Sequence, residues 1–469
     1  MSKKKNLVKN TLIILLGKIS TQFISFLLLP LYTAFLTTSD YGFVDLVTSY
    51  IILLVPLITL ELEMSVFRYL IDARKDKEKT RAIISNNFNT LFKCLLLFSV
   101  FYIILGCFID IPFKWLILLD VVVCVISGNL LQVVRGLGDV IGFSISCFIT
   151  GVITVILNIY LIAFLKLGAY GMLLSIILAN LIGFIYLIFR CRLWKYYSFS
   201  LKDKSLVKSM RKYGLPLVPN SVSWWIVNIS DRTIITMVLG ASFNGIYAVS
   251  NKFPAIISGL LGVFNLSWSE SAALYINSSD KDTYFKEVLN DVFRLFSCLC
   301  LGMIATLPFI FTLLINKEFA DAYLYIPILI IAALFNCLIC IYTGIYIAKK
   351  DTKKVASTTI IGAVINILIN ILFIKFIGLY AASISTAISY FVMTIYRHRD
   401  LNKEMNLSFD KGIISKVVLS FIVVLFSYYY NNLYLNIIIL LLVIIFTYIL
   451  NKNIVHKGLT IILKKLSFK

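Results

Sequence analysis

The sequence predicts an all-α integral membrane protein with about 14 transmembrane helices. Apolar residues make up 60% of the 469, and charged residues only 14%, whereas soluble domains average roughly 45–50% and about 25%. Apolar runs of about 20 residues, long enough to cross a hydrocarbon core of about 30 Å, recur along the whole chain. Lys and Arg are concentrated in every second loop, as the positive-inside rule expects for loops on the cytoplasmic side.

The expected spans follow from these apolar runs and are separated by short polar loops. They are residues 11–31, 43–60, 88–109, 113–134, 140–165, 169–190, 213–239, 245–268, 284–315, 323–348, 354–375, 377–396, 411–430 and 433–451. The first span follows Lys3–Lys5 without the small-residue cleavage site of a signal peptide, so we expect it to be retained.

With the N-terminus placed in the cytoplasm, 35 of the 44 Lys and Arg lie in cytoplasmic segments, and five lie within spans. The external loops hold only Lys114, Lys166, Lys317 and Lys375. This bias accounts for the formal charge of +21. We therefore exclude nucleic acid as a partner and expect a multi-pass membrane protein.

Both termini should lie in the cytoplasm, because the number of spans is even and five basic residues lie in 452–469. Reporter fusions at Asn6 and at Lys469 should both give a cytoplasmic signal. An external C-terminus would mean that a helix is miscounted, most simply at 377–396 or 433–451.

The helices divide into two groups of six, followed by two more. We expect an N-lobe over 1–190, a basic cytoplasmic linker over 191–212 and a C-lobe over 213–396. Residues 397–469 hold helices 13 and 14 and a basic tail. Two six-helix lobes cross the membrane in the same sense and form a parallel repeat, which places a cavity between them on a pseudo-two-fold axis.

Weak internal similarity supports this repeat. Ser39–Phe43 opens the second helix as Ser242–Ile246 opens the eighth. Asn158 precedes Gly168 in the first lobe as Asn370 precedes Gly378 in the second.

Polar groups within the spans are costly in a bilayer and usually face a cavity or a partner. In the first helix Lys18, Gln22 and Ser25 fall at i, i+4 and i+7 and share one face. This shared face favours a cavity role, although a lysine near a helix end can also snorkel to the interface.

The seventh helix carries the most informative pattern. Ser221, Trp225, Asn228 and Arg232 fall at i, i+4, i+7 and i+11 and form a single stripe. Three residues flank the stripe, namely Asn220, Trp224 and Asp231. An aromatic and polar stripe suits a sugar-bearing ligand. The alternative is helix packing, with Asp231 or another acid balancing the charge of Arg232.

Further candidate cavity residues are Tyr247, Asn251 and Lys252 of the eighth helix and Arg294 of the ninth. Arg294 can equally pair with Asp291, three residues before it. The acids Asp45 and Asp120 could bind a cation or a proton, or simply balance the basic groups. Glu61, at the cytoplasmic edge of the membrane, is expected to be solvated.

Nothing in the sequence indicates a cofactor, a metal site or an enzyme. Cys337 and Cys340 lie three apart on one helix without a second pair or a His beside them. The sequence contains no phosphate-binding GxxxxGK[ST] loop, so we expect no ATPase activity.

The stretches Tyr213–Asn220, Asp231–Arg232 and Gly245–Pro254 resemble the polysaccharide-biosynthesis flippases, and Arg135–Gly138 also looks like this family. These are the O-antigen and capsule repeat-unit exporters of the MATE-like MOP superfamily. The helix count and the six-plus-six-plus-two layout extend the resemblance over the full length.

The resemblance implies a substrate, an oligosaccharide on undecaprenyl pyrophosphate, which is moved to the outer face of the membrane. It also implies contact with membrane lipid and partner proteins, a polymerase and a chain-length regulator, with the flippase itself a monomer. Three alternatives remain: a MATE-like drug/cation antiporter, a peptidoglycan-precursor flippase and a membrane-embedded glycosyltransferase or polymerase. Mostly basic cavity candidates argue against the antiporter, and short external loops argue against the enzyme.

Overall fold

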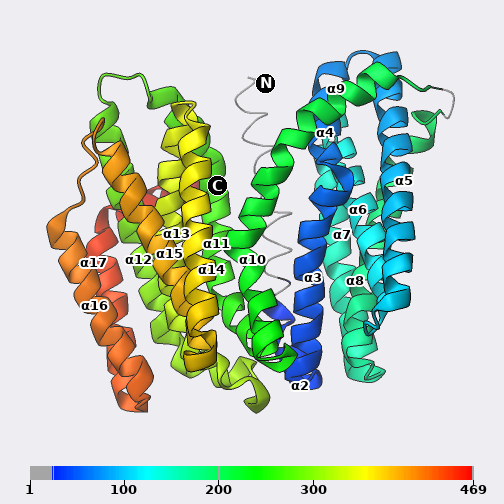
Figure 1. Ribbon diagram of the computed structural model, residues 1–469. Coiled ribbons are helices and arrows are strands. Elements are labelled where there is room, and N and C mark those ends of the chain that lie inside the picture. Colours follow the sequence, from blue (N-terminus) through cyan, green and yellow to red (C-terminus); the bar gives the residue numbers. More distant parts are fainter. Residues whose placement is uncertain (1–23, 25, 199–200, 467–469) are drawn as a thin grey trace. The chain divides into compact units, whose positions relative to one another are not determined.

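The computed structural model describes Ile24, residues 26–198 and residues 201–466, and this part of the chain is helical with no strand (Figure 1). Its α-helices are α2 (Leu29–Phe35), α3 (Thr38–Thr59), α4 (Leu62–Ala73), α5 (Lys77–Phe108), α6 (Lys114–Leu137), α7 (Val140–Asn158), α8 (Gly168–Arg190), α9 (Lys204–Gly214), α10 (Val218–Val238), α11 (Ala241–Tyr275), α12 (Lys281–Leu314), α13 (Ala322–Ala348), α14 (Thr352–Ile377), α15 (Leu379–Leu401), α16 (Lys411–Tyr430) and α17 (Leu433–Leu466). A π-helical turn, η1 (Ile159–Phe164), extends α7, and short 3₁₀ turns are η2 (Leu193–Lys195), η3 (Leu215–Leu217) and η4 (Lys317–Phe319).

The expected membrane fold is confirmed. In the described part, 12 helices are long and apolar enough to cross a membrane. Of the two remaining expected spans, 11–31 lies mostly outside the described residues. The other, 213–239, contains α10, which is 21 residues long and carries a charged pair, Asp231 and Arg232, that lowers its hydropathy.

Two helices lie within segments that the sequence marks only as cytoplasmic loops. These are α4 and α9, which are 12 and 11 residues long. Both are too short to cross a bilayer, and hydropathy therefore does not predict them. A Cβ on Gly136 of α6 would lie 2.8 Å from the Leu70 Cβ of α4. The Arg135–Gly138 motif therefore serves close packing of α4 on α6.

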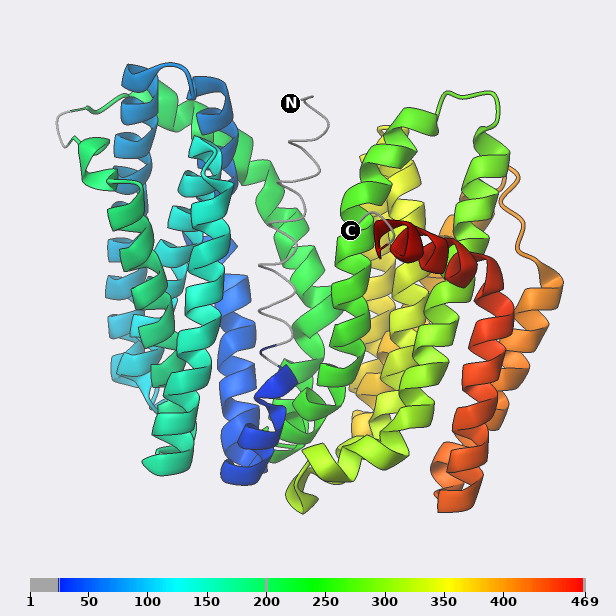
Figure 2. The same ribbon diagram turned by 180° about the vertical axis from the view of Figure 1, so that it is seen from behind.

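The chain forms two compact units, Met1–Ala248 and Val249–Lys469. The boundary falls within α11 and not in the 191–212 linker, because α10 packs along α3 in the first unit. The expected lobes, which are defined by sequence repetition, stay a prediction. Figure 2 shows the helices of each unit from behind.

The segments that open the second and eighth helices contact each other reciprocally within the first unit. Asn244 Nδ2 donates to the Gly42 carbonyl at 2.7 Å, and the hydroxyls of Thr38 and Ser242 lie 2.5 Å apart. A Cβ on Gly42 would lie 2.6 Å from the Gly245 nitrogen, and one on Gly245 would lie 3.2 Å from the Gly42 nitrogen. Reciprocal contact of matched positions is what a local two-fold axis produces, so the contact favours the predicted repeat.

The second pair of matched segments shares two local features. Asn158 and Asn370 are both fully buried. Gly168 and Gly378, which follow them, have φ values of 56° and 57°. A positive φ favours glycine, because a side chain there is sterically strained. A glycine with positive φ at both places also favours the repeat.

Candidate functional site

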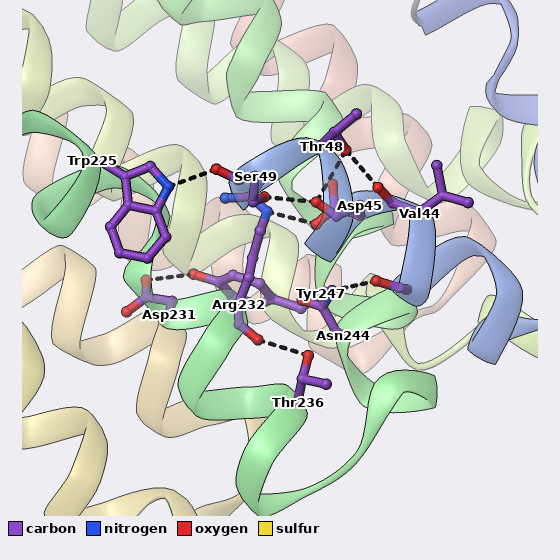
Figure 3. Close-up of polar contacts among 11 residues, drawn as sticks. Val44, Asp45, Thr48, Ser49, Trp225, Asp231, Arg232, Thr236, Asn244 and Tyr247 are labelled. Atoms are coloured by element: carbon purple, nitrogen blue, oxygen red, sulfur yellow. Dashed lines mark hydrogen bonds and ion pairs between the residues drawn. The ribbon is translucent and has the colours of Figure 1, made fainter. Parts of the chain in front are cut away.

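The polar stripe of α10 faces α3 (Figure 3). The Arg232 Nε donates to the Asp45 Oδ2 at 2.6 Å and forms an ion pair with it. Their side chains are only 17% and 15% exposed. The two residues are separated by 187 positions in the sequence. The helical spacing predicts the face that Arg232 occupies but does not identify its partner.

Two more stripe residues point the same way. The Trp225 indole nitrogen donates to the Ser49 carbonyl of α3 at 2.7 Å, and the indole is buried. The Ser221 hydroxyl donates to the Glu61 carboxylate, in the turn between α3 and α4. Much of the stripe is therefore a contact between α10 and the α3–α4 segment.

The expectation that Glu61 is solvated at the membrane edge is wrong, because its side chain is buried and the residue is only 5% exposed. Leu60 and Glu61 both have a positive φ, 53° and 57°. This sharp turn between α3 and α4 brings the Glu61 carboxylate to Ser221. Sequence position at the membrane edge could not show this, because the turn is not marked by glycine.

Asp231 is not the residue that forms the ion pair with Arg232. Its carboxylate accepts a hydrogen bond from the Tyr247 hydroxyl at 3.0 Å, and both side chains are buried. Adjacent residues on a helix point in different directions, so each member of the pair has its own partner. The structure thus brings together Asp231 of α10 and Tyr247 of α11, which the sequence analysis lists as candidates on two different helices.

The guanidinium of Arg232 retains capacity for a further anion. In the described part of the chain only its Nε is engaged, while the two terminal nitrogens have no hydrogen-bond partner. A guanidinium has five N–H donors and can bind a carboxylate or phosphate through two parallel bonds. Asp45 therefore orients the group and leaves its outer edge able to bind a phosphate.

The other α10 candidates are more accessible. Asn220 is exposed, Trp224 is 53% exposed, and Asn228 is half-buried with its amide donating to the Trp224 carbonyl at 2.8 Å. Trp224 is therefore the indole of this pair that a sugar ring could reach, since Trp225 is committed to α3.

The candidates in the second unit are Arg294, which is paired with an acid, and two half-buried residues of α11. Arg294 Nη2 pairs with the Asp291 carboxylate at 2.7 Å on the same helix. Its Nε is buried, with no partner among the described residues. Asn251 and Lys252 of α11 are half-buried.

Of the two acids proposed for ion coupling, Asp45 is paired with Arg232, and Asp120 of α6 is completely buried. The Asp120 Oδ1 accepts from the Cys124 thiol at 3.4 Å, while its Oδ2 has no hydrogen-bond partner in the described part. The candidates Lys18, Gln22 and Ser25 lie outside the described residues.

This fold is shared with known transporters. The lipid II flippase MurJ, in an inward closed conformation, aligns with a TM-score of 0.69 at 16% identity, over 96% of this chain and 100% of that one. An inward-facing multidrug resistance MATE family transporter of the MOP superfamily aligns with a TM-score of 0.62 at 13% identity, over 84% and 95%. These likenesses define the class as a MATE- and MurJ-like helical membrane protein.

The chain belongs to the family of polysaccharide biosynthesis proteins, whose model matches residues 7–268, more than half of its length. An uncharacterized membrane protein of Methanocaldococcus jannaschii is 25% identical over 319 residues, which are 63% of this chain and 74% of that protein. The resemblance drawn from the seventh and eighth helices is thereby confirmed.

Proposed function

We propose that the protein is a flippase that moves oligosaccharide repeat units linked to undecaprenyl pyrophosphate across the bacterial cytoplasmic membrane. It would supply a surface polysaccharide such as O-antigen or capsule and act by alternating access. Membership of the polysaccharide biosynthesis family carries this proposal. The fold shared with a lipid II flippase supports it, because that protein also handles a lipid-linked substrate.

Arg232 is the residue we propose for pyrophosphate binding. A pyrophosphate that crosses a region of low dielectric needs a compensating cation, since an unpaired charge there costs several kcal/mol or more. Arg232 is largely buried, is oriented by Asp45 and has unused terminal N–H groups in the described part. Lys18, Lys252 and Arg294 are the further cations that could hold the pyrophosphate at other stages of transport.

The glycan would follow the accessible side of α10. Sugar rings stack on aromatic faces, and the exposed Trp224 offers such a face beside the amide of Asn228. The lipid tail would stay in the bilayer. Asp120, buried with an unpartnered carboxylate oxygen in the described part, is the acid we propose for coupling to a proton or cation gradient.

A MATE-like antiporter is the alternative that the shared fold supports. Its substrates are cations, which need unpaired acids in the cavity. In the described part of the first unit, Asp45 forms an ion pair with Arg232 and is therefore not available to a cation. This ion pair argues against a cationic substrate beside α10. A peptidoglycan precursor is also anionic and differs from our proposal only in its glycan.

Deleting the gene from its host should distinguish between these three candidate functions. Lipid-linked repeat units should accumulate on the cytoplasmic leaflet, and surface polysaccharide should fall to background, because synthesis continues while export stops. Mass spectrometry of extracted lipids and surface glycan staining measure the two effects, with plasmid complementation as the control. Unchanged surface polysaccharide with increased sensitivity to cationic drugs would favour the antiporter. Arrested growth with accumulated peptidoglycan precursor would favour the peptidoglycan-precursor flippase.

A further inference from the structure

A cavity of about 1060 Å³ lies in the first unit, between α5, the end of α8 and the linker with α9. Its wall is mostly apolar, with side chains that include Phe92, Leu96, Ile126, Leu130 and Trp194. Pockets that bind organic ligands enclose roughly 300–1,000 Å³. This cavity has room for a phosphate headgroup together with part of an acyl chain.

The linker is held on α5 by four hydrogen bonds and forms one wall of the cavity. The Ser85 hydroxyl donates to the Tyr196 carbonyl at 3.1 Å and accepts from the Ser198 N–H at 2.9 Å. The Tyr197 hydroxyl donates to the Asn89 Oδ1 at 3.0 Å, and the Asp203 N–H donates to the Asn86 Oδ1 at 3.0 Å. The cavity wall is therefore built by specific contacts.

The other end of α9 is fixed as well. The Ser65 hydroxyl donates to the Met210 carbonyl at 2.9 Å. A Cβ on Gly214 would lie 2.5 Å from the Leu60 carbonyl oxygen, so only glycine allows this approach. Held at both ends, α9 keeps its side chains in fixed register over the cavity.

Several basic side chains line the cavity. Lys204, Lys208 and Arg211 fall at i, i+4 and i+7 of α9 and share one face, and Lys93 of α5 lines the same cavity. In the described part of the chain, none of these four side chains pairs with a carboxylate.

The cavity also has one acid, Asp203, which is already engaged. It caps α9 by accepting from the backbone of Ser205 and Leu206. The Ser205 hydroxyl, which donates to the same oxygen, and these amides hold the pKa of Asp203 below its usual value. Its charge is therefore committed to the helix N-terminus, and the cavity keeps an excess of positive charge.

Lys93 lies within a membrane-spanning helix, about five residues or roughly 7.5 Å inside the expected start of the span at residue 88. A lysine at this depth can reach the membrane interface, where anionic lipid headgroups are its natural partners. One turn earlier on the same face, the Asn89 Nδ2 is buried and has no hydrogen-bond partner among the described residues. An unpaired donor and an unpaired cation therefore line the same wall.

We propose that this cavity binds an anionic glycerophospholipid of the cytoplasmic leaflet. Lys93, Lys208 and Arg211 would hold the phosphate, Asn89 would donate to a headgroup or ester oxygen, and one acyl chain would lie on the apolar wall. The bound lipid would fasten the linker to α5. This inference is independent of the transported substrate.

The observations favour a phospholipid over other anions with the same phosphate chemistry. Free phosphate would leave the apolar wall unfilled. A transported polyprenyl pyrophosphate must leave its site in every cycle, whereas one wall of this cavity, α9, is held at both ends. An anionic phospholipid is present in the leaflet in excess, and basic clusters at the membrane edge attract it.

The test uses the purified full-length chain in detergent. Phosphatidylglycerol should raise the midpoint of thermal unfolding, because a ligand of the folded state stabilises it, and phosphatidylcholine should not. Native mass spectrometry should show a retained phosphatidylglycerol. In Lys93→Gln/Lys208→Gln its affinity should fall about tenfold or more, since each basic contact contributes substantially to anionic lipid binding.

Lys195→Gln/Lys212→Gln is the matched control. It also removes two charges from the region, but neither residue lines the cavity, so affinity should stay near that of the unmodified chain. Both variants should unfold at the unmodified midpoint without lipid, which excludes misfolding.

Three outcomes would contradict the proposal. An equal loss of affinity in both variants would indicate general surface attraction. Displacement of phosphatidylglycerol by equimolar inorganic phosphate would indicate a simple anion site. Displacement by undecaprenyl pyrophosphate at lower concentration than by phosphatidylglycerol itself would make the cavity a substrate site.

Discussion

Arg232→Gln should abolish transport and also reduce the amount of protein in the membrane. The change leaves the largely buried Asp45 without its counter-charge, and breaking a buried ion pair costs roughly 3–5 kcal/mol. Asp45→Asn/Arg232→Gln should restore abundance, because neither charge then remains. It should not restore transport, since the cation proposed for pyrophosphate is still missing. Membrane abundance by immunoblot and surface polysaccharide together measure the two effects.

Two further variants sharpen this experiment. Arg232→Lys should keep partial transport, because a point charge remains although the bidentate geometry is lost. Arg68→Gln breaks an exposed Arg–Asp pair with side chains 48% and 69% exposed. It should change neither readout, because such pairs contribute little. Full transport by Asp45→Asn/Arg232→Gln would show that the ion pair serves folding alone.

Arg397→Ala should be among the most destabilising substitutions in the second unit. Arg397 of α15 is only 1% exposed and has no carboxylate partner among the described residues. Its guanidinium instead donates to five oxygens of α13 and α14, at 2.6–3.3 Å. The acceptors are the hydroxyls of Thr343, Thr358 and Thr359 and the carbonyls of Ile339 and Val355.

The substitution removes every one of these bonds and leaves a cavity where three helices meet. Hydrogen bonds to charged groups contribute about 1.5–3 kcal/mol each, and truncating a large buried side chain costs roughly 3–5 kcal/mol. A net loss of about 3–5 kcal/mol is expected after desolvation of the charge is subtracted. The midpoint of thermal unfolding in detergent, followed by tryptophan fluorescence, measures it.

Arg399→Ala is the matched control, since Arg399 is an exposed residue of the same helix. Its unfolding midpoint should stay near that of the unmodified chain. If Arg397→Ala were equally harmless, the helices around it would be held together by apolar packing alone, and the buried guanidinium would have no structural role.

Hydropathy predicts the membrane helices well because crossing a bilayer is a requirement on composition and length. The span expected at 411–430 coincides with α16, and that expected at 140–165 covers α7 and its π-helical extension. Hydropathy does not predict α4 and α9, because they are too short to cross the membrane. The helix α4 packs on α6, and α9 lines the cavity beside the linker, and neither role requires a long apolar run.

The candidate site is predicted only in part, because helical periodicity gives the direction of a side chain but not the identity of its neighbour. The stripe through Arg232 is a true face of α10, yet its partner is Asp45 and not Asp231. The burial of Glu61 depends on a left-handed turn at Leu60 and Glu61, and the sequence gives no sign of this turn.

Reconstitution tests the proposed flippase activity most directly. The purified chain would be placed in liposomes that carry a fluorescent oligosaccharide on undecaprenyl pyrophosphate in one leaflet, with a membrane-impermeant quencher outside. We expect transfer between leaflets without ATP, driven by a gradient or by removal of product, and little transfer with Asp45→Asn/Arg232→Gln. Transfer no faster than in protein-free liposomes under every gradient, or a strict requirement for ATP, would contradict the account.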